Sequence, residues 1–94
     1  MKLRYERGAL ADLDEIFAYI AQDNREAATR LVARIEQVVA RIAETPFMGE
    51  ATRKTSFRRF PVGNYLIVYE VGEDEVVIHY VRHGARQRPW EGEG

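Results

Sequence analysis

The chain has 94 residues, 46% of them apolar, which is enough for one domain around a single modest core. It contains no cysteine, and this excludes disulfides, thiolate nucleophiles and thiolate metal sites. With 14 basic and 15 acidic residues the formal net charge is −1, which argues against a protein that coats nucleic acid through its overall charge.

The sequence also lacks the patterns of a membrane or secreted protein. No apolar run approaches the roughly 20 residues that cross a bilayer, and the N-terminus has no apolar stretch typical of a secretion signal. We therefore expect a cytoplasmic protein with no membrane partner. Residues 91–94 are typical of a flexible tail, so we expect a single domain over residues 1–90.

The first half of the chain predicts a short strand followed by a helical hairpin. Residues 2–6 alternate polar and apolar side chains, and a helix is expected from about Gly8. Asp23 is the expected N-cap of a second helix, with Glu26 three residues later as in a capping box, and Pro46 ends that helix. Apolar residues at helical spacing, all expected in the core, are Leu10, Leu13, Ile16, Phe17, Ile20, Ala28, Leu31, Val32, Ile35, Val38, Val39 and Ile42.

The second half predicts a small sheet. After a loop at 47–55, strands are expected at 56–60, 65–71 and 75–81, with turns at 61–64 and around Gly72. The whole is therefore an α+β fold, in which an N-terminal short strand and a helical hairpin pack on a small, mostly antiparallel sheet.

The expected hairpin register gathers basic side chains at one end of that sheet. A turn near residues 73–74 places Val71 opposite Val76 and Tyr65 roughly opposite Arg82. The preceding turn places Arg59 beside the start of the Tyr65 strand. The pattern predicts acidic residues at one end of the sheet and, at the other, Arg58, Arg59, Arg82 and His83.

Three stretches match a known family in their order and spacing. They are Arg58-Arg59-Phe60, Gly63-Asn64-Tyr65-Leu66-Ile67-Val68-Tyr69 and Val81-Arg82-His83-Gly84-Ala85-Arg86. With the short strand and the helical hairpin before them, they make residues 2–88 resemble the ParE/RelE superfamily of bacterial type II toxins, and ParE-type members most closely. The resemblance implies a growth-inhibiting toxin in a hetero-oligomer with a cognate antitoxin, ParD-like or RelB-like, encoded beside it.

The resemblance leaves two modes of action open. RelE-like members cleave mRNA in the ribosomal A site, whereas ParE-like members are described as poisons of DNA gyrase. A nuclease needs a base, cations for the phosphate and an acid. The available residues are Glu50, Lys54, Arg58, Arg59, Arg82 and His83, and the candidates among them are Arg58, Arg59, Arg82 and His83. The lysine-rich pattern of some RelE-like enzymes is poorly met, and no tyrosine follows Tyr80.

Several of these residues also have a simpler structural interpretation. His83 can simply end the last strand, and His79, expected on the face of Val77 and Val81, reads as a structural residue. Arg58 and Arg59 are neighbours in a strand, so they point to opposite faces. Two histidines without cysteine or clustered carboxylates do not form a zinc site, so we expect no metal and no cofactor.

The end of the sheet with the basic side chains is expected to bind a partner, because antitoxins of the family that this chain resembles lay an acidic segment across this surface. The candidate partner-binding residues are Arg53, Lys54, Arg58, Arg59, Arg82, Arg86 and Trp90. The favoured interpretation is a ParE-like toxin that inhibits DNA gyrase through protein contacts, without catalytic residues of its own. The alternatives are a RelE-like, ribosome-dependent mRNA endonuclease and an inert adaptor that only recruits an acidic peptide.

Overall fold

The computed structural model describes residues 1–54 and 56–84. The expected tail at 91–94, the domain boundary at residue 90 and the candidate residues Arg86 and Trp90 lie outside the described residues. The elements in chain order are β1 (Lys2–Tyr5), α1 (Arg7–Ala21), α2 (Arg25–Glu44), η1 (Pro46–Met48), β2 (Glu50–Ala51), β3 (Phe57–Val62), β4 (Tyr65–Val71) and β5 (Glu75–His83).

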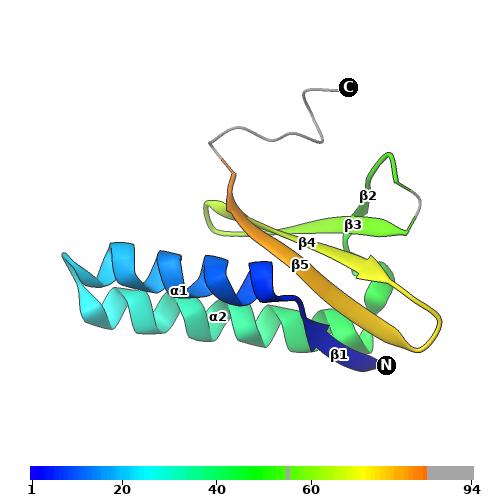
Figure 1. The fold of residues 1–94 in the computed structure, drawn as a ribbon, viewed down its shortest axis with the longest axis horizontal. Helices are drawn as coiled ribbons and strands as arrows, with labels where there is room; N and C mark the ends of the chain where they lie inside the picture. The colour runs from blue at the N-terminus through cyan, green and yellow to red at the C-terminus, as the bar shows by residue number, and fades with distance from the viewer. Residues whose placement is uncertain (55, 85–94) are drawn as a thin grey trace.

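The strands form one sheet with the order β1-β5-β4-β3-β2. Within the described residues, β1 and β5 are parallel, and the other neighbouring strands are antiparallel. Helices α1 and α2 lie side by side on one face of this sheet (Figure 1). The predicted α+β fold is thus confirmed, while β2 is a short additional strand inside the segment that was expected to be a loop.

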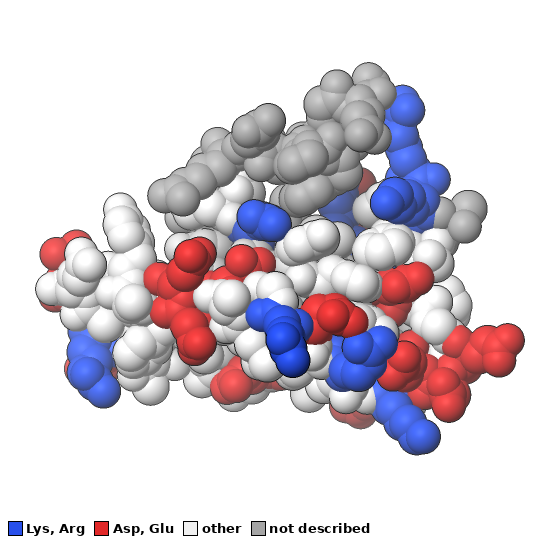
Figure 2. Space-filling model, viewed as in Figure 1, with Lys and Arg blue, Asp and Glu red and all other residues white. Residues whose placement is uncertain are grey.

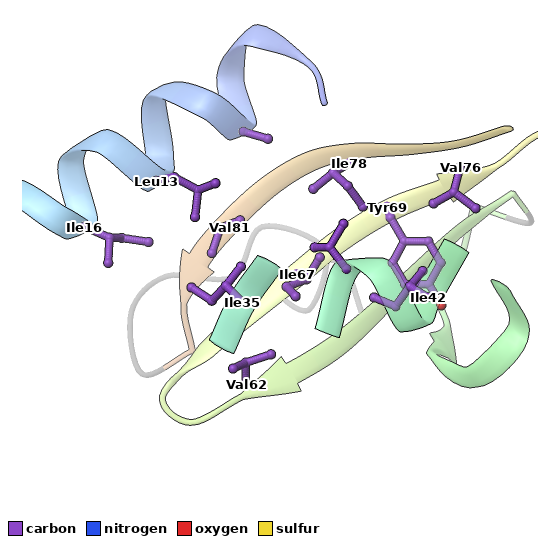
Figure 3. Close-up of a cluster of buried hydrophobic side chains, with 12 residues drawn as sticks. Leu13, Ile16, Ile35, Ile42, Val62, Ile67, Tyr69, Val76, Ile78 and Val81 are labelled. Carbon is purple, nitrogen blue, oxygen red and sulfur yellow. The ribbon is translucent and has the colours of Figure 1, made fainter. Parts of the chain in front are cut away.

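The core lies between the helix pair and the sheet. Side chains from α1, α2 and the inner face of β3, β4 and β5 point toward one another there (Figure 3). Its largest fully buried members include Tyr69, Ile35 and Ile42. Burial of a large aliphatic side chain contributes about 1.5–3 kcal/mol, so this cluster dominates the stability of the fold.

Two details of the helices differ from the sequence-based prediction. Leu10 was expected in the core but is 49% exposed, whereas Ala9 is fully buried, so the stripe on α1 runs through Ala9 and Leu13. The N-cap of α2 is Asn24 and not Asp23, because the Asn24 side chain accepts a hydrogen bond from the Ala27 N–H at 3.0 Å. Asp23 still belongs to the turn that follows α1, where its N–H donates to the Ile20 carbonyl.

Strand β3 is longer than predicted and includes a proline. It runs to Val62, which pairs with Tyr65, so the turn contains only Gly63 and Asn64. Gly63 has a φ of 58°, the left-handed conformation that a two-residue hairpin turn favours at this position. Pro61 was expected in the turn, but in the described part of the chain β2 pairs only with Arg58 and Arg59, so β3 has a free edge at Pro61, where proline is tolerated because its missing N–H would point away from β4.

A β-bulge in β5 changes the predicted register. Val71 pairs with Val76 as expected, but Tyr65 pairs with His83 rather than Arg82, because the pairing shifts by one residue at Val68/Tyr69. Because of the shift, His79 is not opposite any residue of β4 in the strand pairing. As a consequence Val81 belongs to the core cluster and Val77 does not, so the expectation that these two valines share a face is wrong.

Candidate functional site

The sheet face opposite the helices, here called the outer face, has a small apolar centre. Leu66, Val68 and Glu70 of β4 lie on this face. Val77 of β5 lies on it as well, directly opposite Glu70. Val68 and Val77 are only 6% and 5% exposed, although neither belongs to the core cluster beneath the helices. Charged side chains from β3 and β5 surround this centre.

Arg59 lies on the outer face beside Val68 and is already paired. Its Nη2 donates to Glu50 Oε1 at 2.5 Å. Strand β2 creates this pair, because its two residues place Glu50 directly opposite Arg59. The Arg59 side chain is 22% exposed and that of Glu50 is 69% exposed, so an incoming anion meets a partly neutralised guanidinium.

Arg58 points to the opposite side, as expected, and anchors the segment that leads into β2. Its Nη1 donates to the Gly49 carbonyl at 2.7 Å, and its guanidinium lies 4.8 Å from the centre of the Phe47 ring. Phe47 itself is 66% exposed. The contacts of Arg58 therefore present an exposed aromatic ring beside the sheet.

Tyr69 completes this anchor from the core side. Its hydroxyl donates to the Pro46 carbonyl at 2.8 Å and accepts from the Gly49 N–H at 2.9 Å. Burial raises the pKa of Tyr69, against the opposing effects of the Gly49 N–H and the Arg58 charge. Sequence reasoning did not identify this role, since an aromatic residue in a strong strand pattern predicts only packing.

Arg82 and His83 lie at the far end of β5 and point to different sides. Arg82 pairs with Leu66 on the outer face, and its guanidinium lies 4.7 Å from the centre of the Tyr80 ring. His83 pairs with Tyr65 and meets its ring edge-on at 5.2 Å between centroids. The acidic residues of the β4–β5 turn lie at the other end of the strand, as predicted, and acidic side chains gather there in Figure 2.

The predicted gathering of Arg58, Arg59, Arg82 and His83 at one end of the sheet is wrong. Only Arg59 and Arg82 share the outer face, and they are opposite different residues of β4, Val68 and Leu66. The difference arises because β3 continues to Val62, which moves Arg59 three residues away from the turn. Basic side chains therefore spread across the outer face.

His79 is the residue that the bulge adds to the outer face. Its Nε2 lies 3.0 Å from Glu70 Oε1, and its ring centre lies 4.9 Å from that of Phe57. The Ser56 hydroxyl donates to the other oxygen of Glu70 at 3.3 Å. These contacts agree with the predicted structural role of His79, whereas its contacts with Glu70 and Phe57 were not predicted.

The remaining candidates lie in the connection between β2 and β3. Arg53 and Lys54 are both exposed, and the Lys54 ammonium lies 5.5 Å from the centre of the Phe57 ring. Among the described residues, no three His, Asp or Glu side chains are placed to hold a metal ion. Within the same residues, no helix has both the length and the apolar character to cross a membrane.

Comparison with known proteins gives the family. Residues 3–88 match the family described as the ParE toxin of the type II toxin–antitoxin system parDE. This chain belongs to the ParE toxin family. It is accordingly the toxin of a type II toxin–antitoxin system within the wider ParE/RelE superfamily, and the resemblance read from the sequence is confirmed.

Two relatives and one solved structure are similar to this chain. The chain is 40% identical over 90 residues to the putative toxin Y4kP of Sinorhizobium fredii, which covers 94% of this chain and 93% of that protein. It is 37% identical over 78 residues to the toxin RelE2 of Caulobacter vibrioides, covering 83% and 89%. The structure of the chromosomal ParDE system from P. aeruginosa superposes with a TM-score of 0.76 at 23% identity, covering 88% of this chain and 95% of that one, and so supports the fold.

Proposed function

We propose that this chain is a ParE-type toxin that inhibits growth by binding DNA gyrase and that it carries no catalytic residues of its own. The observation that carries the proposal is the dispersal of the candidate nuclease groups. Arg58 donates to a backbone carbonyl behind the sheet, Arg59 is paired with Glu50, and His83 lies against Tyr65. Cleavage of RNA needs a base, an acid and cations around one phosphate.

A cognate antitoxin, ParD-like or RelB-like, neutralises the toxin in a cytoplasmic hetero-oligomer under this proposal. The outer face suits such a partner, because it presents Arg59 on β3 and, on β5, Arg82 and the 40% exposed Tyr80, which pairs with Val68. Acidic side chains of the antitoxin pair with these arginines while its apolar side chains meet the exposed ring of Tyr80.

A second candidate function, RelE-like cleavage of ribosome-bound mRNA, is favoured by the 37% identity to a toxin named RelE2. In that case Arg82 and His83, adjacent at the end of β5, would act with Arg58 or Arg59 after the ribosome repositions them. The two functions differ in whether the histidine takes part in proton transfer.

Two assays on the purified toxin separate these functions. The first is primer extension on an mRNA translated in a reconstituted system, and the second is supercoiling by purified DNA gyrase. We expect intact mRNA and at least a tenfold loss of supercoiling, equally with wild type and His83→Gln. Codon-phased, ribosome-dependent cuts that His83→Gln abolishes would overturn the proposal. If the toxin is active in neither assay and its expression without antitoxin is harmless, the protein is an inert adaptor. That result would also contradict the proposal.

A further inference from the structure

Strand β1 forms one edge of the sheet and has an open side (Figure 1). Among residues 1–54 and 56–84, its one partner strand is β5. The N–H groups of Lys2 and Glu6 donate to carbonyls on the β5 side, at 3.0 and 2.9 Å. Because alternate residues of a strand face opposite edges, the N–H and C=O groups of Leu3 and Tyr5 point away from β5. These groups are placed to pair with a further strand.

The side chains of this edge are only partly covered. Leu3 lies on the same face as Tyr5, which packs on the core, yet Leu3 is 38% exposed. On the outer face, Arg4 donates to Glu6 Oε1 at 2.6 Å and to Glu75 Oε2 at 3.3 Å. The edge therefore combines open backbone groups and an exposed leucine with an arginine whose charge is already balanced.

The strand is complementary to itself in one antiparallel register. When Arg4 lies opposite Arg4 of a second copy, Leu3 lies opposite Tyr5 and Lys2 opposite Glu6. Leu3 and Tyr5 then exchange backbone hydrogen bonds on both sides of the two-fold axis, which gives four bonds. Glu6 has an extended backbone, with φ −73° and ψ 158°, so it can continue the strand and place its carboxylate beside Lys2.

The two adjacent symmetric registers are less favourable. With Leu3 opposite Leu3 of the second copy, Lys2 would lie opposite Arg4, and like charges directly opposite each other are destabilising. With Tyr5 opposite Tyr5, Leu3 would lie opposite Arg7, which belongs to α1 and does not continue the strand. The register centred on Arg4 is therefore the one in which charge, apolar contact and hydrogen bonding agree.

We propose that the open edge of β1 pairs with the same edge of a second copy, so that two toxins form a symmetric dimer with one continuous sheet. Such an interface uses the same surface of both copies, as a two-fold axis requires. The axis is perpendicular to the sheet, so both helix pairs lie on one side and both outer faces on the other. The dimer thus presents Arg59 and Arg82 twice on the same side.

Disulfide trapping tests this register, since the chain contains no cysteine of its own. Residues opposite each other in a non-hydrogen-bonded antiparallel pair have Cα atoms about 4.5 Å apart, within the range that a disulfide spans. Arg4→Cys should therefore form a covalent dimer on mild oxidation of the purified toxin. Lys2→Cys is the matched control, because it lies on the same face of β1 but about 13 Å from its counterpart in the second copy.

Non-reducing electrophoresis measures the rate of dimer formation, and circular dichroism checks that both variants are folded. We expect Lys2→Cys to cross-link at least tenfold more slowly than Arg4→Cys. Equal rates would mean that the thiols meet by random collision and would overturn the proposal.

Sedimentation equilibrium on the toxin without cysteine is the second measurement. The mass of wild type should rise from 10.9 kDa toward twice that value as its concentration increases. Leu3→Pro removes an N–H that points to the open edge and leaves the pairing with β5 intact. It removes two of the four hydrogen bonds, so it should dimerise about 5- to 30-fold more weakly. Wild type that stays monomeric at millimolar concentration, or a dimer that folded Leu3→Pro leaves unchanged, would refute pairing through β1.

Discussion

Replacing Tyr69 with phenylalanine tests whether one hydroxyl holds the segment from Pro46 to Ala51. The hydroxyl makes two hydrogen bonds, to the Pro46 carbonyl and from the Gly49 N–H, and the residue is fully buried. Each such bond contributes about 1 kcal/mol net, so we expect the free energy of unfolding to fall by about 2 kcal/mol. For a domain of this size, that corresponds to a Tm lower by about 8–15 °C.

Urea denaturation followed by circular dichroism measures this change, with Tyr19→Phe as the matched control. Tyr19 is 66% exposed on α1, so the loss of its hydroxyl should change stability by less than about 0.5 kcal/mol. Hydrogen exchange at the Gly49 amide should accelerate only in Tyr69→Phe. Equal unfolding free energies for the two variants would refute the anchoring role of Tyr69.

Three further predictions concern the same fold. Gly49→Ala places a Cβ against the Tyr69 hydroxyl, so it should lower the free energy of unfolding by about 2 kcal/mol in urea denaturation, and an unchanged midpoint would contradict this. Asn24→Ala should cost about 1 kcal/mol in the same assay and Asp23→Ala less than half of that, whereas the reverse order would make Asp23 the cap. Burial raises the pKa of Tyr69 and of Tyr5. The stability that their neutral forms contribute is therefore fully present below the ordinary tyrosine pKa of about 10, and it is lost as pH rises through the raised pKa values of the folded state. Melting curves from pH 8 to 12 should therefore fall more steeply for wild type than for Tyr69→Phe, and parallel curves would exclude a contribution from this tyrosine.

Much of the fold follows from the sequence because the core elements are long and periodic. The stripe on α2 predicts Ile35, Val39 and Ile42 as core residues, and all three are fully buried. The pairing of Val71 with Val76 also follows, since a turn of Gly and acidic residues fixes its own register. In both cases a local pattern agrees with the tertiary packing.

The parts that were not predicted depend on distant contacts. Strand β2 has two residues, Glu50 and Ala51, and neither favours strands. It forms because Tyr69 and Arg58 fix the backbone at Gly49, 20 and 9 residues away in sequence. No local pattern in the sequence predicts that Arg59 pairs with Glu50. The separation of the basic residues therefore could not be predicted from the sequence.

The bulge at His79 joins the core to the outer face. In a regular strand starting with Val76 inward, Val81 would point outward and Arg82 inward. One extra residue reverses this, so Val81 is 3% exposed in the core and Arg82 lies on the outer face. The Val81 N–H, beyond the end of β1, donates to Asp12 of α1 at 2.9 Å, which fixes the new register from the helix side. The same irregularity therefore completes the core and places Arg82 on the outer face, and it explains why alternation alone put Val81 on the face of Val77.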